Sequence, residues 1–106
     1  MKYILLGTLN AEWVQRHAER TTDAKAKLQA LGITLDAVYY TQGPYDFVDV
    51  IDAPSGEAAL GFSIWYASRG YGRIQTIPAF DAAAMEKAAQ GERKGKKRAA
   101  QSAKAR

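Results

Sequence analysis

The residues that could contact a small molecule are polar and aromatic side chains from the middle and the later part of this 106-residue chain. Arg73 and Asp49 are charged residues inside segments that we predict to be β-strands, and a buried charge must either be paired or serve a function. Neighbouring tyrosines and a second aspartate add hydrogen-bonding groups. The candidate ligand-binding residues are Gly43, Tyr45, Asp46, Arg73, Asp49 and Tyr39.

A structural interpretation stands beside each candidate. In Gly43-Pro44-Tyr45-Asp46 the glycine supplies a positive φ, the aspartate bonds local backbone donors and the tyrosine packs over a turn. We favour this interpretation for the run. Arg73 and Asp49 either line a pocket, together with Gln75 and with Tyr39 or Tyr40, or lie near strand ends and reach solvent. Strand register decides between the two positions.

Enzymatic chemistry has weaker support in the sequence. His17 is the only histidine, and histidine suits a general base at a pocket entrance. A lone histidine on the apolar side of a helix is more often a packing residue, so we assign no catalytic residue and favour a protein that is not an enzyme. The enzymatic alternative is a cofactor-independent oxygenase or isomerase of a small aromatic compound, in which Arg73, Asp49 and His17 orient substrate and move protons. It rests on fold analogy alone.

Metal ions and cofactors are not expected. The chain has no cysteine and one histidine, and its acidic residues show no ligand spacing. Trp13, Trp65 and Tyr66 could stack on an aromatic ligand, but aromatic residues at helical spacing more commonly anchor a core or a subunit interface.

The elements that must position these residues follow from the apolar pattern. Segments 2–9, 33–42, 46–53 and 71–80 are rich in β-branched and aromatic residues and are predicted to be strands. Apolar positions spaced by three or four from Trp13 to Leu31 predict a helical region. Thr21-Thr22-Asp23 indicates either a kink in one long helix or a turn before a helix that starts at Thr22. A second helix is predicted over residues 56–69, capped by Ser55.

The order strand–helix–strand–strand–helix–strand is that of the α+β ferredoxin-like fold, with four antiparallel strands and two helices on one face. Gly43-Pro44 joins the middle strands through a loop wider than two residues, so their register stays open. The other face of the sheet needs a cover. A second copy of the chain would supply it and form a dimeric α+β barrel.

Three runs of residues resemble one known family. They are Tyr40-Thr41-Gln42-Gly43-Pro44-Tyr45-Asp46-Phe47-Val48, then Asp52-Ala53-Pro54, and then residues 72–80. They are similar to the GYD domain family, whose Gly-x-Tyr-Asp hairpin is matched by Gly43, Tyr45 and Asp46. The resemblance covers about residues 2–80 and implies a ferredoxin-like fold and a dimeric α+β barrel. It implies no mechanism, because the family has no established catalytic residues.

Charge divides the chain into a domain over residues 1–81, with net charge −2, and a basic Ala/Lys-rich tail over residues 82–106, with net charge +6. The tail could bind nucleic acid through phosphate neutralisation, which makes a nucleic-acid-associated accessory protein a further alternative. It has no interleaved aromatic residues for base stacking. We favour a solvated extension that is helical over residues 83–90 and disordered after Gly91.

The expected partners are therefore a second copy of the chain and a small organic ligand. No run of apolar residues is long enough for a membrane span, and the apolar N-terminal run is too short for a signal peptide. The lack of cysteine fits a cytoplasmic protein.

Overall fold

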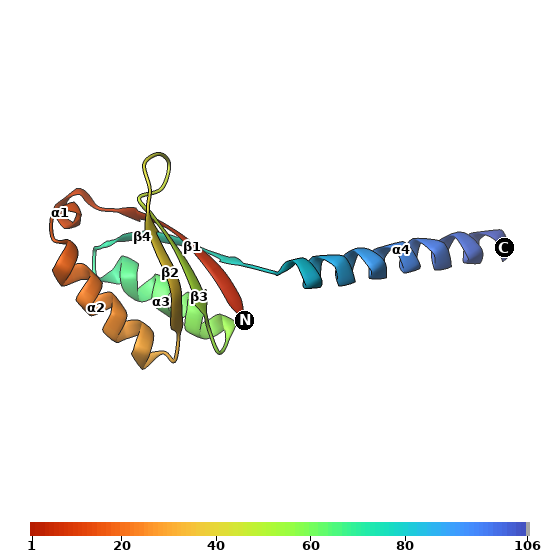
Figure 1. The fold of residues 1–106 in the computed structure, drawn as a ribbon, viewed down its shortest axis with the longest axis horizontal. Coiled ribbons are helices and arrows are strands. Elements are labelled where there is room, and N and C mark those ends of the chain that lie inside the picture. Colours follow the sequence, from red (N-terminus) through yellow and green to blue (C-terminus); the bar gives the residue numbers. More distant parts are fainter. Residues whose placement is uncertain (106) are drawn as a thin grey trace.

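The computed structural model describes the backbone of residues 1–105 and the side chains of residues 1–93. Four strands form one sheet in the order β2-β3-β1-β4, and every neighbouring pair is antiparallel. Helices α2 and α3 cover one face of the sheet (Figure 1). This is the predicted ferredoxin-like arrangement. The elements are β1 Lys2–Leu9, α1 Ala11–Val14, α2 His17–Ala30, β2 Thr34–Tyr40, β3 Phe47–Asp52, α3 Gly56–Ser68, β4 Gly72–Pro78 and α4 Ala82–Ala105.

The first helical region is interrupted earlier than the sequence indicates. The break lies at Gln15 and Arg16, between α1 and α2, and α2 runs without interruption through Thr21 and Thr22. Both expected positions for a kink or a helix start were therefore wrong. The Thr21 hydroxyl donates to the His17 carbonyl at 2.9 Å and the Thr22 hydroxyl to the Ala18 carbonyl at 2.8 Å. These bonds satisfy the hydroxyls inside the helix, so they do not compete with it.

A core of aliphatic and aromatic residues fills the space between sheet and helices. Its largest fully buried members are Leu5, Ile51, Phe62 and Tyr66. The Phe47 ring lies directly over Gly7 of β1, where a Cβ would approach the ring to 1.9 Å. The absence of a side chain on Gly7 therefore leaves the space that the Phe47 ring occupies, and Phe47 forms a wall of the cleft described below.

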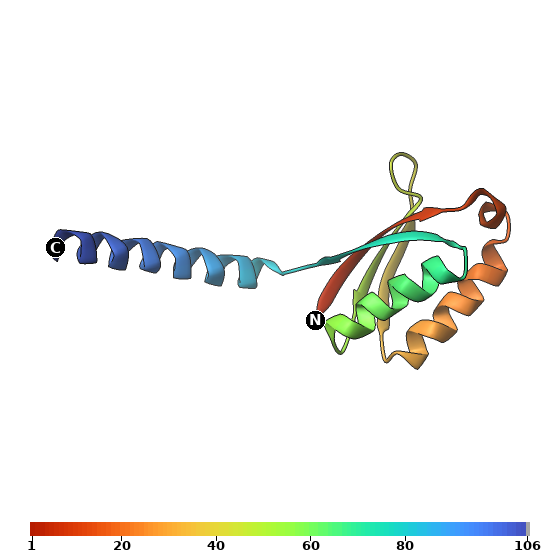
Figure 2. The same cartoon turned by 180° about the vertical axis from the view of Figure 1, so that it is seen from behind.

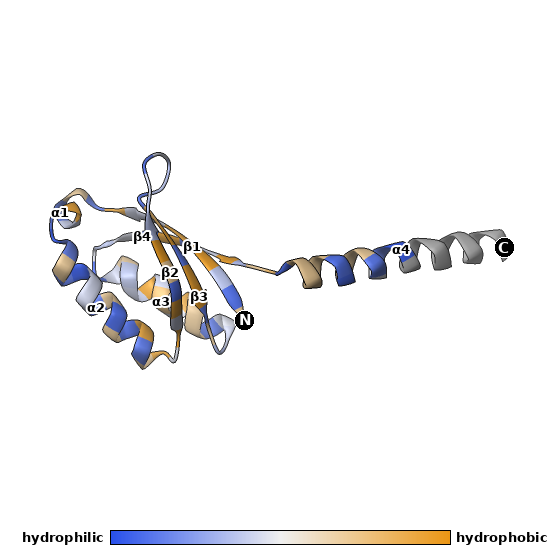
Figure 3. Ribbon diagram, viewed as in Figure 1, coloured by the Kyte–Doolittle hydropathy of each residue, from blue (hydrophilic) through white to orange (hydrophobic). Residues whose placement is uncertain are grey.

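The opposite face of the sheet carries apolar side chains that no described residue covers. Strands β1 and β3 are hydrophobic along much of their length, as the colouring of Figure 3 shows. Side chains alternate between the two faces of a strand, so residues in register with each other share a face. Those on the uncovered face include Ile4, Leu6, Val48, Val50, Tyr39 and Ile77.

Helix α4 leads away from the domain (Figures 1 and 2). Asp81 caps its start, where the Asp81 carboxylate accepts a hydrogen bond from the Ala84 N–H at 2.8 Å. The helix continues past Gly91 to Ala105. The sequence predicts a helix that ends at residue 90 and disorder after Gly91, and both expectations were wrong. Within the described part of the chain, no helix has both the length and the hydrophobicity needed to span a membrane.

Candidate ligand-binding cleft

A cleft of about 200 Å³ lies between α2 and the edge of the sheet formed by β2 and β3, with α3 beneath it. Its volume is below the range of roughly 300–1,000 Å³ that is typical of pockets for drug-sized ligands, so it suits a smaller molecule. The cleft is lined by His17, Arg20, Thr21, Ala24, Lys25 and Leu28 of α2, by Leu35, Val38, Tyr40, Phe47 and Asp49 of the sheet, and by Phe62 and Tyr66 of α3.

Asp49 is the acidic group of the cleft. It lies in the middle of β3, opposite Leu5 on one side and Val38 on the other, and therefore points toward the helices. Only 9% of the residue is exposed, and its carboxyl accepts no hydrogen bond from the residues whose side chains are described. Burial raises the pKa of Asp49 to about 6, an effect that the positive charge of Arg20 partly offsets.

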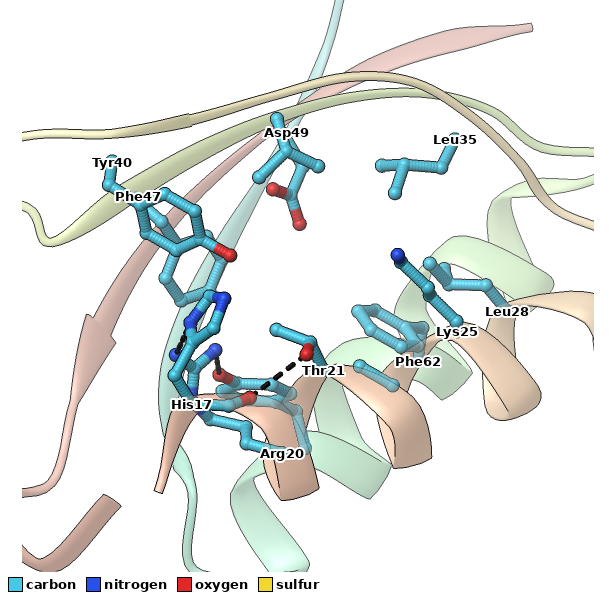
Figure 4. A pocket seen from close by; sticks show the side chains of 13 residues that line it. His17, Arg20, Thr21, Lys25, Leu28, Leu35, Tyr40, Phe47, Asp49 and Phe62 are labelled. Carbon is cyan, nitrogen blue, oxygen red and sulfur yellow. Dashed lines mark hydrogen bonds between the residues drawn. The ribbon is translucent and has the colours of Figure 1, made fainter. Parts of the chain in front are cut away.

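Arg20 is the buried basic group, with 4% exposure. Its Nη2 lies 3.2 Å from His17 Nδ1, and its Nη1 donates to the Tyr66 hydroxyl over a long 3.4 Å. Its Nε has no partner within the described residues. Arg20 and Asp49 form no ion pair with each other in this part of the chain, although both face the cleft (Figure 4).

His17 and Tyr40 meet at one end of the cleft. Their rings are 5.1 Å apart and nearly perpendicular. Because arginine has no acceptor, the contact with Arg20 makes His17 Nδ1 the acceptor and leaves the proton of the neutral ring on Nε2. Burial raises the pKa of Tyr66 to about 12, so its hydroxyl stays protonated. The cleft thus presents several hydrogen-bond donors at this end and a carboxylate on the facing wall.

Of the six candidate ligand-binding residues, the structure places Asp49 in the cleft and the other five outside it. Arg73 is exposed on β4, opposite Thr8 and on the far face of the sheet. Tyr39 is 64% exposed on that same face, and Tyr40 takes the inward position. The reason is a register shift between Leu35 and Ala37. Because β2 has one extra residue there, each later side chain of the strand lies on the face opposite to the one that simple alternation predicts.

The Gly-x-Tyr-Asp run has structural roles. Gly43 has a φ of 134°, the positive value predicted for it. The Asp46 carboxylate accepts a hydrogen bond from the Leu9 N–H at 2.7 Å, and the Asp46 N–H donates to the Gly7 carbonyl, also at 2.7 Å. The Tyr45 hydroxyl donates to Gln75 of β4 at 3.0 Å. Asp46 therefore bonds the end of β1, 37 residues away, in addition to shaping its own turn.

We expect Asp46→Ala to destabilise the fold without affecting the cleft. The substitution leaves the Leu9 N–H without its acceptor, and a part-buried donor without a partner costs about 1–2 kcal/mol. Urea unfolding measures this loss. Tyr45→Phe, which removes only the bond to Gln75 at a half-exposed position, is the milder control. Loss of ligand binding by a folded Asp46→Ala protein would instead make the hairpin part of a binding site.

Arg20 is the buried charged residue of the cleft that the sequence reasoning missed. It precedes Ala24 and Leu28 by four and eight residues, so all three share one helix face. The buried Leu28 marks that face as the inner one. This spacing was the available signal, and only packing against α3 shows that Arg20 is buried rather than extended into solvent.

Comparison with known proteins relates most of the chain to one family. The family model described as "GYD domain" matches residues 3–89. A curated relative is "Glutamine synthetase and cystathionine beta-lyase binding protein" from Thermus thermophilus. It is 32% identical over 85 residues, which cover 76% of this chain and 90% of the relative.

Proposed function

Because this chain belongs to the GYD domain family, we propose that it is a homodimeric binding protein whose cleft between α2 and the sheet holds a small organic ligand. One observation carries the proposal: two buried groups of opposite charge, Arg20 and Asp49, face a cavity of about 200 Å³ and form no direct ion pair within the described part of the chain. Buried charges are costly unless something pairs with them. A bound molecule would supply the missing partners.

The uncovered sheet face supports the proposed homodimer. Ile4, Val48 and Val50 are only half-buried on this face, and Ile77 is 40% exposed. A contiguous apolar surface of this kind marks an interaction site. A second sheet packed on it about a two-fold axis would bury both copies and form the dimeric α+β barrel. Each protomer keeps its own cleft, because α2 lies on the other side of the sheet. The absence of cysteine suits the cytoplasm, where we propose that the protein acts.

Native mass spectrometry of the protein purified from its own host tests this function. We expect a dimer that retains a small molecule on each chain, and we expect the retained mass to be lost in an Asp49→Asn, Arg20→Met double variant. A variant with Lys27→Met, which removes a charge from α2 outside the cleft, is the matched control and should keep the molecule. A protein whose mass equals that of its sequence alone would contradict the binding function.

A second candidate function is binding to another protein. The Thermus relative is named for binding glutamine synthetase and cystathionine β-lyase, and this chain has an exposed apolar pair on α3, Leu60 at 56% and Ile64 at 60%. We expect the protein to bind one of these two enzymes from its own host, each purified and assayed separately by surface plasmon resonance. Ile64→Asp should weaken the binding and Ile64→Leu should preserve it. No binding to either enzyme would remove this candidate and leave the ligand cleft untouched.

A further inference from the structure

The geometry points to a ligand of the α-amino acid type, a small zwitterion that places its carboxylate on Arg20 and its ammonium on Asp49. This inference rests on the proposed ligand-binding function and names the chemical class of the ligand. It is carried by the arrangement of charged groups around the cleft.

The carboxylate end is defined by Arg20 and its neighbours. A guanidinium carries five N–H donors in a planar fork that matches a carboxylate, and described contacts engage it only at His17 and Tyr66. The Tyr66 hydroxyl and the remaining ring nitrogen of His17 are further donors. That nitrogen points toward the open space in Figure 4. An anion at this end would therefore meet donors from three side chains.

The ammonium end is defined by Asp49 on the opposite wall. Figure 4 shows its carboxyl pointing from the sheet across the cavity, toward α2. An ionised carboxylate can only accept hydrogen bonds, and Asp49 receives none within the described part of the chain. An ammonium group supplies three donors and the compensating charge, so it satisfies the group that the protein leaves without a partner.

A ligand with one kind of charge fits less well. Within the described part of the chain, the cleft has three charged side chains, Arg20, Asp49 and the exposed Lys25. A diamine would bring a positive group toward Arg20 and Lys25, and a dicarboxylate would bring a negative group toward Asp49, the one of the three that is both acidic and buried; like charges close together are unfavourable. The walls between the two ends include the apolar side chains of Leu28, Leu35 and Phe62. A cleft of about 200 Å³ is smaller than the pockets that typically hold drug-sized ligands, which suits a free amino acid rather than a peptide.

Protein-detected NMR titration of the full chain with each of the twenty standard L-amino acids, one at a time, tests the inference. We expect at least one to bind and to shift amide signals of α2 and β3. Its α-N-acetyl form lacks the ammonium and its α-amide form lacks the carboxylate, and each should bind about tenfold or more weakly. The inference is overturned if no amino acid binds, or if both modified forms bind as well as the parent.

Two variants test which group of the ligand each charged residue binds. Asp49→Asn should weaken binding of the parent amino acid about tenfold or more but should change binding of the N-acetyl form less than about twofold. Arg20→Met should show the same pattern with the α-amide form, and Lys27→Met should leave every affinity unchanged. Equal losses for parent and modified forms would contradict the assignment. The wild-type titrations stand even if a variant does not fold.

Together, the native mass spectrometry and the titrations distinguish a failure of this inference from a failure of the function on which it rests. If the host-purified protein retains a small molecule but no amino acid binds, the ligand-binding function holds and the zwitterion assignment fails. If succinate or 1,4-diaminobutane binds more tightly than every amino acid, the assignment fails in the same way. A host-purified protein without any bound molecule that also binds no amino acid contradicts both.

Discussion

Replacing Asp49 with asparagine should stabilise the protein at neutral pH by about 2–3 kcal/mol. The reason is the burial of the carboxyl, which raises its pKa from 3.8 to about 6. In the unfolded chain the group titrates near its ordinary value. At a pH between these two pKa values, the folded state binds more protons than the unfolded state. The free energy of unfolding therefore falls as the pH rises from about 4 to about 6, and it stays lower at higher pH. Asparagine cannot ionise, so the variant does not lose this stability.

Urea unfolding at about pH 4 and about pH 7.5, at one fixed protein concentration, measures the effect. The gain should appear at the higher pH and nearly vanish at the lower one. Asp52→Asn is the matched control on the same strand. The pKa of Asp52 is lowered by hydrogen bonds from the N-terminal amino group and from Lys2, so its ionised form stabilises the fold and its replacement should not raise stability. An Asp49→Asn protein no more stable than the wild type at pH 7.5 would contradict the account.

The same substitution should remove ligand binding while it adds stability. A residue that costs the fold free energy and contributes to a site is a recognised pattern in binding proteins and enzymes. Asp49 fits this pattern because its charge lies next to apolar residues of the core, such as Phe47 and Ile51.

Introducing an aspartate at Val50 should dissociate the proposed dimer. Val50 lies on the uncovered face of the sheet, between Ile4 of β1 and Ala37 of β2. At the centre of a two-fold interface the substitution places two unpaired charges in an apolar contact, and each desolvated charge costs several kcal/mol. The dissociation constant should therefore rise about 100-fold or more, as measured by sedimentation equilibrium.

Leu60→Asp is the control for this experiment. Leu60 is an exposed apolar residue on α3, on the other layer of the domain, so the same change there should leave the dimer intact. Far-UV circular dichroism of the Val50→Asp protein should match the wild type, because Val50 is only half-buried in the single chain. Dissociation by Leu60→Asp but not by Val50→Asp would place the interface on the helices instead.

The sequence predicted the fold well because the relevant signals are local. Glycine ends the helices at Gly32 and Gly70, both with positive φ, and Ser55 caps α3 through a hydrogen bond from the Ala58 N–H. The break before α2 escaped prediction. A separate contact that no local pattern reveals lies before α1, where the Asn10 side chain donates a hydrogen bond to the Gly70 carbonyl, 60 residues away.

The site was predicted less completely because it depends on register and packing. Asp49 could be chosen because a charge interrupts the apolar run of β3. Tyr39 was preferred to Tyr40 on no firm ground, since the register shift after Leu35 reverses the faces of β2 and leaves no clear mark in the sequence. Arg20 becomes a site residue only through its contacts with His17 and Tyr66, and Tyr66 lies 46 residues further along the chain.

The central claim is that Arg20 and Asp49 bind the two ends of one small molecule. A high-resolution crystal structure of the protein purified from its own host tests it most directly, because the electron density between α2 and β3 shows what occupies the cleft. We predict density for one organic molecule that touches both the guanidinium and the carboxyl. Ordered water alone in the cleft, or an Arg20 side chain paired directly with Asp49, would contradict the claim.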